Sequence, residues 1–139
     1  MPTLWEISAL AALAQCLVTE IDRSVDHGET PTVPREWIRR ENKWRAARWG
    51  VEADLVVEDT GHTRPLREVV DELVDRLHPL AQELDCADEL ADLLRITAEG
   101  PSYIRQRRVM ADTGSLPEVV SHLRGEFDES VRAEGAAGT

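Results

Sequence analysis

Apolar residues recur at helical spacing in several stretches of this chain, with charged residues between them. The first stretch follows a capping-box sequence from Thr3 to Glu6. In a capping box the side chain of each of these two residues accepts a hydrogen bond from the backbone N–H of the other. It predicts an amphipathic helix over residues 4–26 with an apolar stripe formed by Ile7, Leu10, Ala14, Leu17, Val18 and Ile21.

Helix start and stop signals divide the rest of the chain. Pro34 fits a first helical turn and Gly50 fits a C-cap, so we expect a helix over 34–49. A further helix begins at Thr63 and is kinked or interrupted at His78 and Pro79. Others follow over 87–99 and 102–111, and the last begins at a second capping box, residues 115–118. The apolar pattern fades after residue 128, which predicts one helical domain over 1–128 and a flexible tail over 129–139.

One short stretch has the character of an extended segment rather than a helix. Leu55, Val56 and Val57 are consecutive β-favouring or apolar residues, and Asp59 to Gly61 form a turn signal after them. Such a segment needs partners for its backbone hydrogen bonds, either in a hairpin near residues 62–64 or in another chain. The predicted fold class is therefore mainly α, with five or six helices and one short extended segment.

The charge of the chain limits its partners. A net charge of −11 opposes nonspecific binding to nucleic acid or to anionic lipid. Fifteen arginines accompany a single lysine, Lys43, and this acidic, lysine-poor composition suits a protein kept soluble in a salt-rich cytoplasm. We find no secretory leader and no apolar run near eighteen residues, so we expect a soluble cytoplasmic protein without a membrane partner.

Residues that commonly bind metals are scattered. Cys16 and Cys86 lie seventy residues apart in helical patterns, which favours two buried apolar thiols over a disulfide. The four histidines show no metal-ligand spacing, and the carboxylates fall opposite the apolar stripes. The sequence therefore predicts no metal site and no self-contained catalytic residues.

Two arginine clusters remain as candidate chemistry. One lies on the stretch 37–49 beside three tryptophans, and the other comprises Arg105, Arg107 and Arg108. In an acidic chain these arginines could simply pair with carboxylates. Alternatively, their planar guanidinium groups bind phosphate or carboxylate oxygens of a ligand in pairs.

The order and spacing of several segments resemble the C-terminal portion of the type 2 glutamate-cysteine ligases, the ATP-dependent carboxylate-amine ligases. The resemblance runs from Met1 to about Phe127 and is clearest in Asn42-Lys43-Trp44-Arg45-Ala46-Ala47-Arg48-Trp49-Gly50, in Arg64-Pro65-Leu66, and in Gly100 ahead of Arg105-Gln106-Arg107. It implies the helical C-terminal part of an α+β, glutamine synthetase-like fold. It also implies that the sheet, with the ligands for ATP and Mg²⁺, belongs to an N-terminal half that this sequence lacks.

The resemblance also suggests which residues face a substrate. It places Asn42, Arg45 and Arg48 at a cleft that holds glutamate or the phosphates of ATP, with Arg105 and Arg107 as weaker candidates. Arg105 to Arg108 could instead brace the helices through salt bridges. In such ligases the γ-carboxylate of glutamate is activated as an acyl phosphate and the amine of cysteine, or of another substrate, attacks it.

Two functions follow as hypotheses. The first is the C-terminal part of an ATP-dependent glutamate-cysteine ligase, inactive until it joins its N-terminal half. The second is a nonenzymatic helical interaction module that retains the ligase framework, with Trp37, Trp44 and Trp49 as an apolar anchor for a partner. Formation of a homo-oligomer stays open in both.

Overall fold

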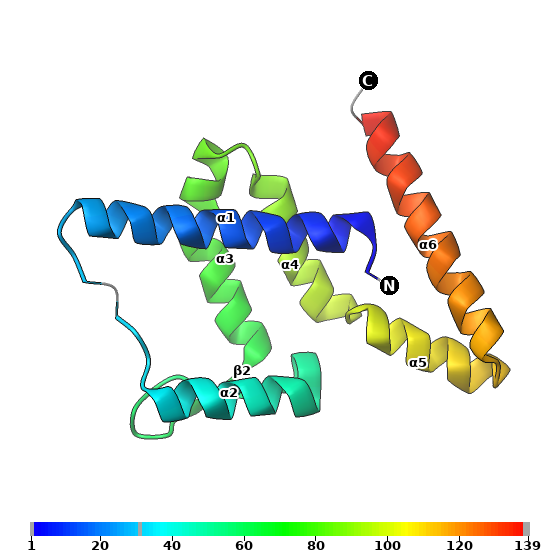
Figure 1. The fold of residues 1–139 in the computed structure, drawn as a ribbon, viewed down its shortest axis with the longest axis horizontal. Coiled ribbons are helices and arrows are strands. Elements are labelled where there is room, and N and C mark those ends of the chain that lie inside the picture. Colours follow the sequence, from blue (N-terminus) through cyan, green and yellow to red (C-terminus); the bar gives the residue numbers. More distant parts are fainter. Residues whose placement is uncertain (1, 31, 138–139) are drawn as a thin grey trace.

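The chain is mostly helical in the computed structural model, which describes residues 2–30 and 32–137 (Figure 1). Within these residues there are six α-helices, one 3-10 turn and one two-stranded hairpin. In chain order the elements are α1 (Leu4–Asp26), α2 (Glu36–Trp49), η1 (Gly50–Glu52), β1 (Asp54–Val56), β2 (Thr63–Pro65), α3 (Leu66–Glu83), α4 (Ala87–Glu99), α5 (Ser102–Thr113) and α6 (Leu116–Ala137). The predicted fold class, mainly α, is confirmed.

Helix α1 begins and ends where its local signals predict. The Glu6 carboxylate accepts hydrogen bonds from the Thr3 backbone N–H at 2.7 Å and from the Thr3 hydroxyl at 2.9 Å. These bonds fix the first turn of α1. They also give hydrogen-bond partners to polar groups of Thr3 and Glu6 that would otherwise be buried without them. The helix stops at His27, and Gly28 follows with a positive φ.

The core forms where α1 crosses α3 and α4, which lie behind it in Figure 1. The buried face of α1 carries small residues, Ala9, Ala12 and Cys16, and these meet Leu77 of α3 and Leu90 of α4. Small side chains allow the helices to approach closely. Most of the stripe recognised in the sequence lies on another face: Ile7, Leu10, Val18 and Ile21 are exposed.

The extended segment pairs within the chain. Strands β1 and β2 are antiparallel, with Leu55 opposite Arg64 and Val56 opposite Thr63. This confirms the hairpin alternative and corrects the predicted start of the next helix, because Thr63 lies in a strand. Helix α3 begins at Leu66, whose N–H donates to the Ala53 carbonyl at 2.8 Å.

The structure also bears on two other predicted features. Helix α3 is not interrupted at Pro79 but continues through it, although proline cannot donate a backbone hydrogen bond there. Helix α6 continues to Ala137, so the predicted tail from residue 129 is helical as far as that residue, and 138–139 lie outside the described residues. The Leu4 N–H donates to Ser130 Oγ at 3.0 Å, which ties the later part of α6 to the start of α1.

The cysteines are buried and free, as predicted, with their Sγ atoms 3.9 Å apart. The expectation that no segment could span a membrane needs correction, because α1 is long and apolar enough to do so by length and composition. Core helices of soluble proteins pass the same test, and one face of α1 packs against α3 and α4.

Candidate functional site

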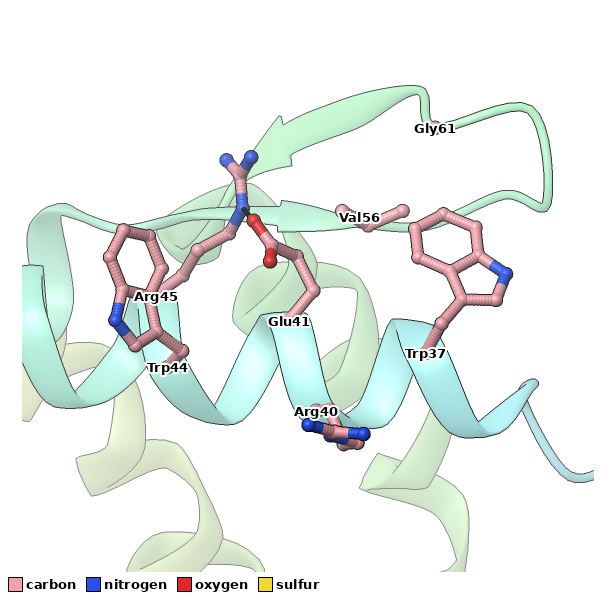
Figure 2. Close-up of a pocket in the computed structure, with 7 residues that line it drawn as sticks. All are labelled: Trp37, Arg40, Glu41, Trp44, Arg45, Val56 and Gly61. Atoms are coloured by element: carbon pink, nitrogen blue, oxygen red, sulfur yellow. Dashed lines mark hydrogen bonds and ion pairs between the residues drawn. The ribbon is translucent and has the colours of Figure 1, made fainter.

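An open hollow of about 850 Å³ lies between α2 and the β1–β2 hairpin (Figure 2). Figure 2 shows Trp37 and Trp44 at its two ends and the Glu41–Arg45 ion pair between them. The hairpin contributes Val56 and Gly61. The hollow thus combines apolar rings with a polar centre, a combination common in sites that orient a small polar ligand.

Asn42 holds the hairpin against α2. Its Nδ2 donates to the Val56 carbonyl at 2.9 Å, and its Oδ1 accepts from the Val56 N–H at 2.7 Å. One side-chain amide therefore satisfies both backbone groups of a strand residue, as a neighbouring strand would. The structure thus gives Asn42, predicted to hold a substrate, a positioning role in shaping the hollow.

Arg45 is also engaged with the protein. Its Nε donates to Glu41 Oε1 at 2.8 Å, and its Nη1 donates to the Asp54 carbonyl at 3.2 Å. Its guanidinium group borders the hollow with about a quarter of the side chain exposed. A ligand anion there would share Arg45 with Glu41, so Arg45 is a shared donor rather than a free cation.

Arg48 belongs to a guanidinium–indole cluster, which we define as Trp44, Arg45, Arg48 and Trp49. The two indole rings meet edge to face, with centroids 5.0 Å apart. The Arg48 guanidinium carbon lies 5.7 Å from each ring centroid, and that of Arg45 lies 6.0 Å from the Trp49 ring. Such cation–π contacts orient a guanidinium group while leaving its N–H groups able to bind oxygen atoms.

A second hollow, of about 500 Å³, lies between the end of α2 and the start of α5. Arg48 and Trp49 line it from α2, and Tyr103, Gln106 and Arg107 line it from α5. The Arg107 guanidinium carbon lies 5.5 Å from the Tyr103 ring centroid. The structure thus brings together Arg48 and Arg107, two of the predicted site residues. No ion pair to either is found within the described part of the chain.

Gly50 allows α2 and α5 to approach at this hollow. It caps α2 with φ of +58°, and a Cβ atom at this position would lie 2.2 Å from the Tyr103 hydroxyl. Any side chain would force the Tyr103 hydroxyl to move, in addition to adopting an unfavourable backbone conformation. The predicted capping role of Gly50 is confirmed, and the structure adds a contact role.

Arg105 joins α5 to α1 and α6 through salt bridges, as in the bracing role that the sequence left open for this residue. Its Nη1 and Nη2 donate to the two oxygens of Glu6 at 3.0 and 2.9 Å, and its Nε lies 2.9 Å from Glu126 Oε1. Nη1 also donates to the Gly100 carbonyl at 3.2 Å. Burial raises the pKa of Glu6, but hydrogen bonds from Arg105 and Thr3 outweigh it and leave this pKa below its ordinary value.

Comparison with known proteins supplies the family. The model of the Glutamate-cysteine ligase family 2 (GCS2) matches residues 1–122. The chain belongs to this family. A relative in Frankia alni named "Putative glutamate--cysteine ligase 2-1" is 46% identical over 130 residues, covering 92% of this chain and 34% of that protein. The corresponding protein of Frankia casuarinae is 43% identical over 129 residues, covering 92% of this chain and 34% of that protein. A relative in Paenarthrobacter aurescens named "Putative glutamate--cysteine ligase 2-2" is 47% identical over 125 residues, covering 88% of this chain and 32% of that protein.

The chain therefore spans about one third of the length of the curated glutamate-cysteine ligase relatives it matches. Among the described residues, no group of three or more His, Cys, Asp or Glu side chains is placed to hold a metal ion.

Sequence reasoning missed Tyr103 and Gln106, which line the second hollow. Tyr103, Gln106 and Arg107 follow the i, i+3, i+4 spacing that places side chains on one helical face. That spacing was readable in the sequence. Their position opposite Arg48 was not, because more than fifty residues separate the two segments.

Proposed function

We propose that this chain is the C-terminal part of an ATP-dependent glutamate-cysteine ligase and that its guanidinium–indole cluster binds an anionic group of a substrate. Family membership and coverage of about one third of the relatives support the ligase assignment. The observation that carries the binding role is the convergence of Arg48 and Arg107 on one hollow.

The chemistry of this hollow suits a phosphate or a carboxylate. Guanidinium groups offer paired N–H donors that match two oxygens of such an anion. The indoles of Trp44 and Trp49 orient Arg48, so little side-chain freedom is lost on binding. In the ligase reaction these residues would hold the glutamate carboxylate or the ATP phosphates while the acyl phosphate forms and the amine attacks it.

A transplant experiment tests this function. The matching third of the Frankia alni relative is replaced by this chain, and ADP release that depends on both glutamate and cysteine is measured. We expect turnover in the chimera. We expect Arg48→Met to raise the KM of one substrate roughly ten- to hundredfold, because hydrogen bonds to charged groups contribute about 1.5–3 kcal/mol. Lys43→Met, an exposed change on the same helix, is the control and should leave KM unchanged.

The alternative is a nonenzymatic interaction module. It is favoured by the exposure of Trp37, Trp44 and Trp49, since indoles often anchor protein partners. A chimera that folds but releases no ADP, together with an Arg48→Met variant that loses only binding to a protein partner, would favour this module and reject the ligase function.

A further inference from the structure

Helix α1 has two apolar faces, and only one of them is covered by the described chain. The buried face packs on α3 and α4. The other face carries an outer stripe, which we define as the exposed apolar residues Ile7, Leu10, Ala11, Ala14, Val18, Ile21 and Val25. At 3.6 residues per turn these positions share one side of the helix.

The outer stripe is long and without charge. It runs about 27 Å along the helix, at 1.5 Å per residue. Its five large side chains are 44–67% exposed, and the two alanines near its middle leave room for a close neighbour. Gln15 and Asp22 lie exposed along one border. An apolar strip with a polar border is typical of a protein interface, and soluble monomers rarely leave one this extended in water.

We infer that the outer stripe binds the part of a family 2 ligase that this chain does not span. The curated relatives are about three times as long as the matched segment, so each carries further sequence outside that segment. This inference takes its partner from the proposed function, but it concerns assembly and not catalysis.

Two other occupants are less consistent with the structure. A second copy would bring together two chains that each carry a charge of −11. A lipid bilayer would have to accept a helix whose flanks hold ion pairs to the rest of the molecule, Glu20 with Arg76 and Arg23 with Glu83. Insertion would also remove α1 from the core and expose Leu77 and Leu90.

The test mixes this chain with the separately produced segment of the Frankia alni relative that lies outside the matched region. Size-exclusion chromatography with light scattering should detect a one-to-one complex. Val18→Asp should weaken it at least tenfold, because a carboxylate would enter the centre of the stripe. Val120→Asp is the matched control: Val120 lies on α6 and is 64% exposed, against 67% for Val18.

A fusion covers the case in which the relative's segment does not fold alone. The same segment is joined ahead of Met1, and amide hydrogen exchange of residues 4–26 is compared with that of the isolated chain. Exchange at least tenfold slower in the fusion, restored by Val18→Asp and not by Val120→Asp, supports the inference. It is overturned if neither a complex nor slower exchange is found, or if the Val18→Asp variant binds as the unmodified chain does.

Other occupants would also show themselves. A stable dimer of the isolated chain, or binding to phosphatidylcholine vesicles, overturns the inference if Val18→Asp abolishes it. Catalysis is scored separately by ADP release. A complex that Val18→Asp weakens, but that releases no ADP, supports the interface and rejects the proposed ligase function. An active chimera that Val18→Asp does not affect supports the ligase function and rejects the interface.

Discussion

The Glu6–Arg105–Glu126 network joins α1, α5 and α6, and its loss should destabilise the fold. Arg105 gives Glu6 two charge-assisted hydrogen bonds, and Glu6 is only 4% exposed while Arg105 is 17% exposed. In Arg105→Met the Glu6 carboxylate stays buried and keeps only the two hydrogen bonds from Thr3. Breaking a fully buried pair costs about 3–5 kcal/mol. Partial exposure of Arg105 reduces our expectation to about 2–3 kcal/mol of unfolding free energy.

Urea unfolding followed by far-UV circular dichroism measures this loss. Glu6→Gln and the double variant complete a mutant cycle, in which the double variant should lose at least about 1 kcal/mol less than the sum of the single variants. Arg108→Met, an exposed change on the same helix, should cost less than about 0.5 kcal/mol. Additive losses of unfolding free energy, or a loss in Arg105→Met as small as that in the control, would show that this network does not stabilise the fold.

Acid pH supplies a second signature of the same network. The pKa of Glu6 is lowered in the folded protein, so its contribution to stability is present above the unfolded value near 4.5 and is lost as pH falls through the folded value. In Arg105→Met, burial remains and the hydrogen bonds from arginine are gone. The cost of the variant should therefore shrink as pH falls, and it should be smallest once pH lies below the lowered pKa of Glu6 in the unmodified protein, where the carboxyl group is neutral in both proteins.

Three further predictions concern single positions. Asn42→Leu should lower the unfolding free energy by about 1–3 kcal/mol in urea, because both backbone groups of Val56 lose their partner; an unchanged midpoint would contradict this role. Gly50→Ala should lower Tm, and Tyr103→Ala should reduce that loss by removing the colliding ring; equal losses in both backgrounds would exclude the collision. Burial raises the pKa of Cys16 to about 11, so stability should fall as pH rises from about 9 towards 11, and Cys16→Ala should flatten this dependence in thermal melts.

Helix positions were largely predictable because their signals are local. Thr3 and Glu6 form a capping box from four consecutive residues, and Gly50 ends α2 where a side chain would be unfavourable. The errors arose where the sequence pattern leaves two structures open. Thr63 could begin a helix or lie in a hairpin strand opposite Val56, and the observed pairing of β1 with β2 decides between them.

The packed face of α1 could not be read from the sequence for a different reason. Helix α1 is apolar on two sides, so hydrophobic periodicity identifies the helix but not which side meets α3 and α4. The structure buries the side with Ala9, Ala12 and Cys16, where small residues allow close packing. Ile7 and Val18 are larger, yet they remain exposed.

The candidate site shows the same division between local and long-range information. The cluster of arginine and tryptophan on α2 is visible in the sequence, and so is the four-residue spacing of Glu41 and Arg45, but the partners of Arg105 are not. Arg105 resembles Arg48 and Arg107 in type, and only the fold pairs it with Glu6 and Glu126. Sequence reasoning therefore located the helices of the site without separating bracing arginines from those facing a hollow.

Charge adds a condition for the proposed anion site. At least nine of the fifteen arginines have carboxylate partners, whereas the chain as a whole carries −11, so its distant carboxylates repel an approaching anion. Salt screens that repulsion over about 10 Å at 0.1 M, but it affects hydrogen bonds at contact with Arg48 and Arg107 much less. Binding of phosphate to this chain should therefore tighten, or stay constant, as sodium chloride rises from about 0.02 to 0.2 M. Steady weakening over that range would mean that attraction by exposed arginines alone, and not a shaped contact at the hollow, holds the anion.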